Sequence, residues 1–270
     1  MSSNKDEYLW YTDLHLDKIF PWTFVRFIRH IIKVNPKGVF LTGDISNGWL
    51  LPYHLRILVN FIKCPIYFVL GNHDLHFSSI DKVHGKIRSL CKEFSNLIWL
   101  TEADVIGLND EVAIIGAEGW YDAELGNPNY LRATLDWFLT KDFRQLPTWN
   151  DRINAFRKLS DESVVILEKK LEEAIKQKYK TVYILTHIPP WKNATNYEGT
   201  FFERYHLPYN VNLRLGKMIE RFAMNKDMNI VVCAGHIHSD RWIRVANNIE
   251  CKVNKAKYYG LIRKEEHIFL

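Results

Sequence analysis

The 270-residue sequence has few cysteines and no long apolar run. Its cysteines lie far apart and form no C-x-x-C pair, which argues against a zinc ribbon or a disulfide framework. They are Cys64, Cys91, Cys233 and Cys251. No apolar run approaches the roughly 18 residues of a membrane span, and Met1–Tyr8 lacks the apolar core of a signal peptide. We therefore expect a soluble protein in a reducing, cytoplasmic setting, without a membrane partner.

The sequence also has no block of like charge, no repeat and no low-complexity tract. Its 36 Lys or Arg and 31 Asp or Glu give a net charge of +5, which tolerates an anionic substrate. Because no run of five or six like charges occurs, nucleic acid is a possible partner that the composition does not indicate. Hydrophobic residues make up 47%, which excludes global disorder. The length fits one domain, residues 1–270, with an insertion.

Short apolar runs alternate with helical patterns along most of the chain. We expect strands at 9–12, 38–42, 65–70, 112–116, 181–186 and 229–234, and helices at 22–34, 53–62, 78–94, 160–179 and 212–225. The tail 241–261 resembles strands around the turn pair Asn247-Asn248. Such alternation predicts an α/β sheet with helices on both faces. Residues 118–159 lack a clean strand, so we expect a helical insertion at about 118–180 that covers one end of the sheet.

Five of the apolar runs are followed directly by residues that bind metals. These residues are Asp13 and His15, Asp44, Asn72, His187, and His236 with His238. In open α/β sheets, ligands bind outside the carboxyl ends of the strands, so the five ends would converge. Seven such donors exceed the needs of one tetrahedral ion and suit two ions that share a bridging carboxylate.

The spacing within these motifs has a physical reason. In extended backbone, residues i and i+2 point to the same side, so both donors of D-x-H or H-x-H reach one cluster. Gly43, Gly71 and Gly235 allow sharp turns and close backbone approach. Each motif alone occurs by chance, or as a turn or a surface pair. Their conjunction in order, each directly after an apolar run, is what indicates a site.

The set D-x-H, G-D, G-N-H-D, H and G-H-x-H resembles the calcineurin-like metallophosphoesterase superfamily over residues 13–238. The resemblance implies a four-layer α/β/β/α sandwich with a dinuclear metal site between two sheets. It implies that Asp13, His15 and His238 bind one metal, that Asn72, His187 and His236 bind the other, and that Asp44 bridges them. His73 would be a proton donor that binds neither metal.

Two divalent ions about 3.5–4 Å apart clamp an in-line displacement at phosphorus. A bridging hydroxide would attack, and His73 would protonate the leaving oxygen. His73 would then need a partner that accepts its other N–H. The adjacent Asp74 is one candidate, and the alternative is that Asp74 only caps the following helix. The donor types suit Mn, Fe or Zn.

Departures from the family pattern separate its branches. Protein Ser/Thr phosphatases carry Asp-Arg-Gly after the bridging Asp, where this chain has Asn47-Gly48-Trp49, and G-N-H-E where it has G-N-H-D. Lipid A precursor hydrolases carry Arg at the position of His73. Both activities are therefore disfavoured. We expect hydrolysis of a phosphodiester or phosphomonoester on a small or nucleotide-like substrate. The alternatives are a nuclease acting on DNA or RNA, and a non-catalytic metal-binding scaffold, which commonly loses donors that this chain keeps.

The segment 189–211 starts at the expected site and supplies candidate substrate contacts. Arg204 would grip a phosphate, while Tyr205 or Trp191 would stack on a base. The alternative is a polar loop with packed aromatics. Other aromatic residues would line the entrance or pack in the core: Trp49, Trp120 and Tyr121. His76 lies beside the loop of His73 and is a candidate for indirect support of the site.

Overall fold

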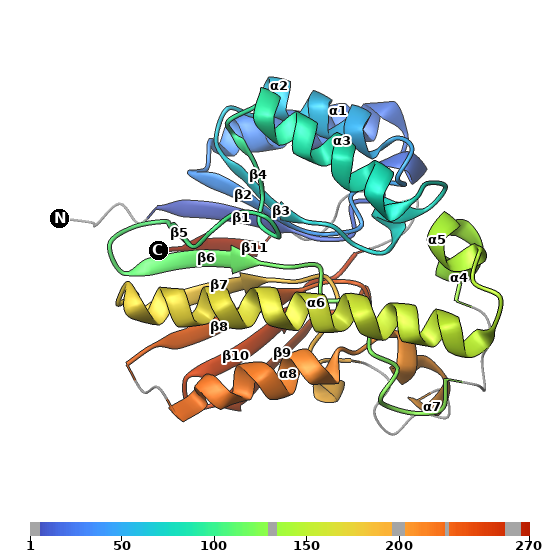
Figure 1. The fold of residues 1–270 in the computed structure, drawn as a ribbon. Coiled ribbons are helices and arrows are strands. Elements are labelled where there is room, and N and C mark those ends of the chain that lie inside the picture. Colours follow the sequence, from blue (N-terminus) through green and yellow to red (C-terminus); the bar gives the residue numbers. More distant parts are fainter. Residues whose placement is uncertain (1–5, 129–133, 196–202, 225–226, 257–265) are drawn as a thin grey trace.

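The computed structural model describes residues 6–128, 134–195, 203–224, 227–256 and 266–270. Two β-sheets lie face to face, and a layer of helices covers the outer face of each (Figure 1). The fold is therefore the expected four-layer α/β/β/α sandwich. In the described part of the chain, no helix combines the length and the apolar character needed to cross a bilayer.

Sheet A has the strand order β11-β1-β2-β3-β4. Its strands are β1 (Glu7–Tyr11), β2 (Gly38–Thr42), β3 (Ile66–Val69), β4 (Leu97–Trp99) and β11 (Glu266–Phe269). Strands β1 to β4 are parallel, and β11 runs antiparallel to β1 at the edge. Their carboxyl ends therefore point to the same edge of the sheet.

Sheet B has the order β5-β6-β7-β8-β10-β9. Its strands are β5 (Ile106–Gly107), β6 (Val112–Gly116), β7 (Thr181–Leu185), β8 (Asn229–Ala234), β9 (Arg241–Ala246) and β10 (Ile249–Val253). Strands β6, β7, β8 and β10 are parallel, while β5 and β9 are antiparallel edges. The predicted turn pair Asn247-Asn248 joins β9 to β10.

The helices form two layers and a cluster at one end. Sheet A is covered by α1 (Pro21–Val34), α2 (Leu51–Phe61) and α3 (Ile80–Glu93), and sheet B by α6 (Trp149–Lys176) and α8 (Leu213–Glu220). The short helices are α4 (Asp136–Leu139), α5 (Lys141–Arg144) and α7 (Glu203–His206), with 3-10 turns η1 (Leu16–Lys18), η2 (His73–Leu75), η3 (Lys192–Ala194), η4 (Leu207–Tyr209) and η5 (Arg221–Met224).

The alternation of side chains along each strand builds three apolar clusters. In β1, Tyr8 and Trp10 face sheet B, whereas Leu9 and Tyr11 face α1 to α3. A third cluster lies between sheet B and its helices. Cys233 is fully buried between the sheets, as expected of a core residue. The expectation of one sheet with helices on both faces is thus corrected, because each sheet has helices on one face and the other sheet on its second face.

Several expected elements differ at their ends. Strands β2, β6 and β8 have the predicted bounds, but α6 begins at Trp149 rather than at residue 160. A capping box explains this start, because the Thr148 side chain accepts from the Asp151 amide and the Asp151 carboxylate accepts from the Thr148 amide. Strands β4, β5 and β11 were not predicted, because segments of two to four residues carry too little periodicity to recognise.

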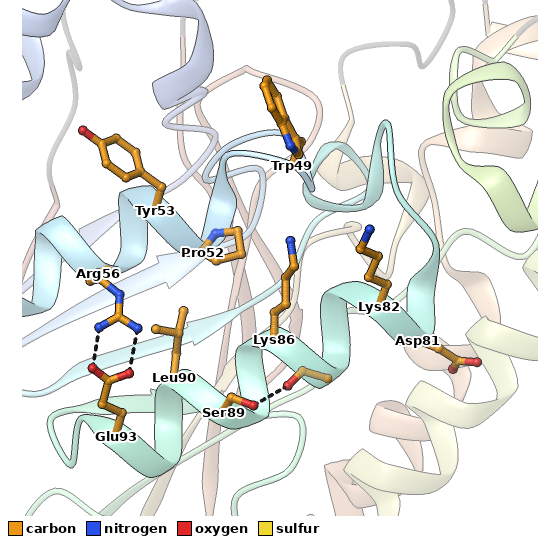
Figure 2. A pocket seen from close by; sticks show the side chains of 11 residues that line it. Trp49, Pro52, Tyr53, Arg56, Asp81, Lys82, Lys86, Ser89, Leu90 and Glu93 are labelled. Carbon is orange, nitrogen blue, oxygen red and sulfur yellow. Dashed lines mark hydrogen bonds and ion pairs between the residues drawn. The ribbon is translucent and has the colours of Figure 1, made fainter.

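Surface hollows lie against the helices, among them one between α2 and α3 and one beside α4 and α5, which fall within the predicted insertion. Helices α4 and α5 lie at the end to which β6 points (Figure 1). A groove of about 700 Å³ lies between α2 and α3 (Figure 2).

Candidate metal centre

The loops after five strands bring the seven predicted donors together. Loops after β1, β2 and β3 of sheet A meet loops after β7 and β8 of sheet B. Two clusters of donor atoms result, each with its atoms within 4.8 Å of one another: Asp13, His15 and His238, and Asp44, His187 and His236. A third cluster of the same kind joins His15, Asp44 and His73.

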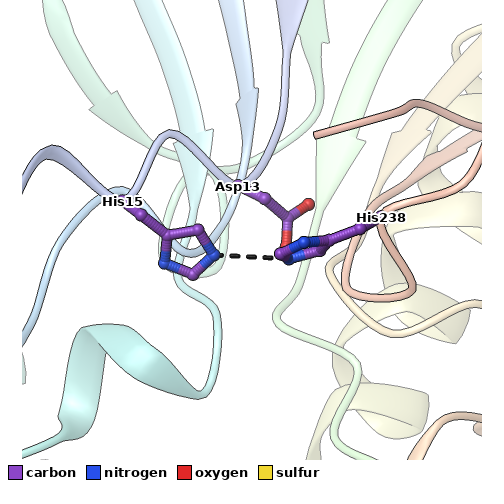
Figure 3. Close-up of side chains that lie close together, drawn as sticks. All are labelled: Asp13, His15 and His238. Atoms are coloured by element: carbon purple, nitrogen blue, oxygen red, sulfur yellow. Dashed lines mark hydrogen bonds and ion pairs between the residues drawn. The ribbon is translucent and has the colours of Figure 1, made fainter. Parts of the chain in front are cut away.

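The first cluster combines one carboxylate with two imidazoles (Figure 3). His238 Nε2 lies 3.1 Å from Asp13 Oδ1 and 3.3 Å from His15 Nε2. Two hydrogen bonds fix the Asp13 carboxylate. Its Oδ2 accepts from Thr12 Oγ1 at 2.6 Å and from the His236 amide at 3.0 Å. This cluster therefore holds three converging donors that suit one cation.

Asp44 lies between the two clusters and faces both. Its Oδ2 is 3.7 Å from His15 Nε2, and its Oδ1 is 3.3 Å from His187 Nε2. The His73 amide also donates to Oδ1 at 2.8 Å. Each carboxylate oxygen thus serves a different set of histidines, which is the arrangement that a shared ligand between two cations needs.

Asn72 completes the second cluster and shows that the cluster suits a cation. Asn72 Nδ2 donates to Asp136 Oδ1 at 2.9 Å. This bond turns the Asn72 Oδ1 atom toward His187 and His236. His236 Nε2 donates to the Tyr209 carbonyl at 2.9 Å, so its Nδ1 carries the lone pair. This Nδ1 lies 3.1 Å from Asn72 Oδ1. Two acceptors that face each other at this distance are satisfied by a shared cation.

The electrostatics of the buried acids support the same fit. Burial opposes ionisation of Asp13, yet its hydrogen bond to His238 and the charges nearby hold its pKa at about 2. Burial likewise opposes ionisation of Asp44, and His187 nevertheless keeps the Asp44 pKa well below its usual value. In the described part of the chain no Lys or Arg pairs with either acid. Buried carboxylates whose neighbours are histidines, which can exchange a proton for a metal ion, favour metal binding.

The histidines respond to burial and to these acids in opposite ways. Burial lowers the pKa of His15 to about 3 and that of His236 to about 4, so both present neutral imidazoles at neutral pH. His187 is buried as well, but Asp44 and Asp13 raise its pKa to about 10, while its Nδ1 donates to the Thr42 carbonyl at 2.8 Å. A cation bound at Nε2 would displace the second proton.

The backbone at the donors is strained. Five of the seven donors have a positive φ, from 41° to 70°: Asp13, His15, Asp44, His236 and His238. The expectation of extended backbone in D-x-H and H-x-H is therefore wrong. Left-handed residues turn these short loops tightly, and non-glycine residues in this region are uncommon and concentrate at functional sites.

Two glycines permit the close approach of the loops. Gly43 has a φ of 86°, and a Cβ there would lie 2.7 Å from His187 Nδ1. A Cβ on Gly71 would lie 2.3 Å from Asp44 Oδ1. Any side chain at either position would push the strand ends apart, as the sequence predicted for these positions.

Asp136, in α4 of the insertion, is a supporting residue that the sequence did not reveal. Besides Asn72, its carboxylate accepts from His76 Nε2 at 2.7 Å and from Tyr121 Oη at 2.9 Å. Burial opposes ionisation of Asp136, but His76 lowers its pKa below its usual value. The insertion thus orients a predicted metal donor, and His76 supports the site indirectly, as the sequence suggested.

His73 contacts Lys18, whereas the candidate partner Asp74 bonds backbone amides. Its Nε2 lies 3.8 Å from Asp44 Oδ2, while its Nδ1 lies 3.3 Å from Lys18 Nζ. An ammonium group only donates, so Nδ1 is the acceptor and the proton of a neutral His73 is on Nε2. Burial lowers the pKa of His73, and His76 and Lys18 lower it further. Lys18 was not found from the sequence, because a single lysine in a loop carries no signal.

Asp74 holds loops together rather than contacting His73. Its Oδ1 accepts from the Ser46 amide and its Oδ2 from the Gly71 amide, both at 2.8 Å. Burial and the nearby Asp44 raise the pKa of Asp74 well above its usual value. The prediction of Asp74 as a catalytic residue is corrected to a structural role, because both oxygens are occupied by backbone amides.

The three predicted substrate contacts have different outcomes. Trp191 is buried against α8 and donates from Nε1 to Glu220 Oε1 at 2.7 Å, so it is a core residue and not a stacking surface. The side chain of Arg204, in α7, lies outside the described residues. Tyr205 is partly buried on α7, and its role stays a prediction. Trp120 and Tyr121 are buried, whereas Trp49 is exposed.

Comparison with known proteins agrees with this geometry. The sequence model described as calcineurin-like phosphoesterase matches residues 8–240. The chain belongs to the calcineurin-like phosphoesterase family. Proteins of this family are metal-dependent phosphoesterases with a two-metal site. The clustered Asp and His donors are consistent with that requirement.

The individual proteins that match this chain share low sequence identity with it. The uncharacterized protein L509 of Acanthamoeba polyphaga mimivirus is 28% identical over 172 residues, which are 58% of this chain and 58% of that protein. The match thus spans less than two thirds of that relative's length.

Solved structures show the fold. The phosphopantetheinyl hydrolase of Mycobacterium tuberculosis matches with a TM-score of 0.67 and 14% identity, over 94% of this chain and 90% of that one. A dimetal phosphatase from Danio rerio matches with a TM-score of 0.57 and 10% identity, over 94% and 88%.

Proposed function

We propose that the protein hydrolyses a phosphodiester or phosphomonoester of a small or nucleotide-like substrate with two divalent cations, Mn, Fe or Zn. The observation that carries this proposal is the position of Asp44, whose two oxygens face separate histidine sets. Asp13, His15 and His238 would hold one cation, and Asn72, His187 and His236 the other. Such cations would polarise the phosphoryl oxygens and generate a nucleophile from water near neutral pH.

In this proposal His73 acts as a neutral hydrogen-bond donor. The Lys18 contact leaves the His73 proton on Nε2, the atom that faces Asp44 and the cluster. From there Nε2–H donates to the leaving oxygen or to a phosphoryl oxygen, a contact that strengthens as negative charge develops. The positive charge of the Lys18 ammonium beside His73 would also attract a substrate phosphate.

Turnover of aryl phosphate esters tests the proposal. The purified protein, loaded with Mn²⁺, is assayed with an aryl phosphodiester and with the matching monoester. We expect turnover of at least one, loss on chelation, and recovery when the metal is restored. Metal-loaded protein that hydrolyses neither ester would favour a metal-binding scaffold instead.

A further inference from the structure

The helical layer over sheet A carries an excess of positive charge. Residues 21–94 contain 10 Lys or Arg and 4 Asp or Glu, whereas the rest of the chain contains 26 and 27. Of the four acids, Asp44 and Asp74 are buried at the metal centre, Glu93 is paired with Arg56, and Asp81 is exposed on α3. The outer surface of this layer therefore attracts anions.

The groove between α2 and α3 combines such cations with exposed aromatic rings (Figure 2). Trp49 and Tyr53 lie on the α2 side and are 71% and 61% exposed. Lys82 and Lys86 lie on the α3 side, and both ammonium groups point toward the side on which Trp49 lies. A ligand in this groove would meet rings and positive charges together.

A second hollow continues this groove toward the insertion. It has a volume of about 360 Å³ and lies between residues 77–79 and helices α4 and α5. Phe77 and Phe138 contribute rings to it, and Lys141 and Arg144 contribute charges. The two hollows adjoin at Lys82, which lines both, and we call them together the basic track.

The cations of the basic track differ from those on the opposite helical layer. Within the described ranges, Lys82, Lys86, Lys141 and Arg144 form no ion pair. On α6 and α8, by contrast, Arg214 pairs with Asp161 at 2.6 Å, and Arg221 pairs with Glu168 at 2.6 Å. The four side chains of the basic track are therefore available to an external anion, whereas Arg56, which also lines the groove, is paired with Glu93.

Hydrogen bonds fix the backbone of two residues that carry exposed rings, Phe77 and Trp49. Phe77 has a φ of 63°, which is unfavourable for a bulky residue, and its amide donates to the Leu139 carbonyl at 2.8 Å. Its ring is nevertheless 64% exposed. The Trp49 amide donates to Asn47 Oδ1 at 3.1 Å. A strained backbone that presents an apolar ring to solvent points to a function outside the core.

The basic track starts close to the metal centre. The rings of His73 and His76 lie 4.4 Å apart, and those of His76 and Phe77 lie 6.3 Å apart. We propose that the basic track binds single-stranded nucleic acid, with its lysines and arginine on the phosphates and its aromatic rings against the bases. Rings beside cations are the usual platform for unpaired strands, and a hollow suits a narrow strand better than a flat bilayer. That the bound strand is also hydrolysed rests on the function proposed above.

Fluorescence anisotropy with a labelled 12-nucleotide oligo-dT or oligo-rU tests this binding. The Asp44→Asn protein is used, so that the probe is not cleaved and binding is measured separately from hydrolysis. We expect Lys82→Glu/Lys86→Glu to weaken binding at least about tenfold and to reduce the slope of log affinity against log salt by about 1.4. Trp49→Ala should weaken binding about tenfold without changing that slope.

Arg29→Glu/Lys33→Glu on α1 is the matched control, because it makes the same charge change at the same spacing outside the basic track. It should leave the salt slope unchanged. Equal losses in both double variants would overturn the proposal, since only net charge would matter. A duplex that binds as tightly as the single strand would also overturn it, as would sedimentation with anionic vesicles without oligonucleotide binding. Oligonucleotide binding combined with failure of aryl ester turnover would keep the basic track and reject the hydrolysis.

Discussion

The two ends of the metal centre are held differently. At the inner end, Asn72, His187 and His236 each bond a second partner, and Asn72 and His187 are 6% and 1% exposed. At the outer end, Asp13 and His15 are buried, at 3% and 1% exposed, and the side chains of His238 and His73 are 17% and 15% exposed. Each end thus combines buried donors with a partly exposed histidine, His236 or His238. The second hydrogen bonds of the inner end orient its donors before any cation binds, and the partial exposure of His73 beside the outer end marks a side that water reaches.

Asp44→Asn should have the largest effect, because it disturbs both ends at once. Asn keeps the shape but removes the charge that faces both histidine sets. We expect kcat/KM for an aryl ester to fall by about 10³-fold or more, and metal content by elemental analysis to fall with it. Retention of a tenth of the activity with full metal content would contradict the bridging role.

Asp136→Asn tests the inner end alone. It weakens the acceptor that orients Asn72, so metal affinity should fall by about 10–100-fold, and excess metal should restore activity. Asp142→Asn is the control, since this acid belongs to the same insertion but accepts from the Ile80 amide. Equal effects of the two variants would show that the insertion acts only through stability.

Lys18→Met tests the outer end. If Lys18 contacts the substrate phosphate, KM should rise about tenfold while kcat changes less, and Lys18→Arg should retain most of the affinity. A change confined to kcat would place Lys18 behind His73 rather than on the substrate.

Metal removal has the smallest expected effect, which is a decrease in the thermal stability of the fold. A cation at 100 times its dissociation constant stabilises the fold by about 2.7 kcal/mol, which is about 5–10 °C in Tm for a chain of this size. Thermal unfolding with and without Mn²⁺ measures the shift. The shift should be smaller in Asp136→Asn at the same metal concentration, and an unchanged shift would remove the inner end from metal binding.

The sequence predicted both the strands and the metal-binding residues because one sequence pattern indicates both. Buried parallel strands are continuous apolar runs, and a polar donor directly after such a run can only lie at its carboxyl end. The supporting role of Asp136 was not predicted, because Asp136 lies 64 residues from Asn72 in a segment without strands. Trp191 was misassigned because an aromatic residue near a site gives the same pattern whether it faces the pocket or, as here, α8.

The backbone of the loops was beyond the reach of the sequence. Left-handed conformations at Asp13 and His238 are uncommon for non-glycine residues, and nothing in the local sequence marks them in advance. The partner of His73 was equally hidden, since Lys18 reaches it only when the loop after β1 lies against the loop after β3.

Strand β11 has a consequence for how the protein is made. Residues 266–269 pair with β1, and Leu9 lies opposite His267. The strand that leads into Asp13 therefore acquires one of its two neighbours from a segment about 260 residues further along the chain. Contacts between such distant segments form slowly, so this sheet edge, which supports the first donor loop, is expected to be completed after β1 and β2 have paired.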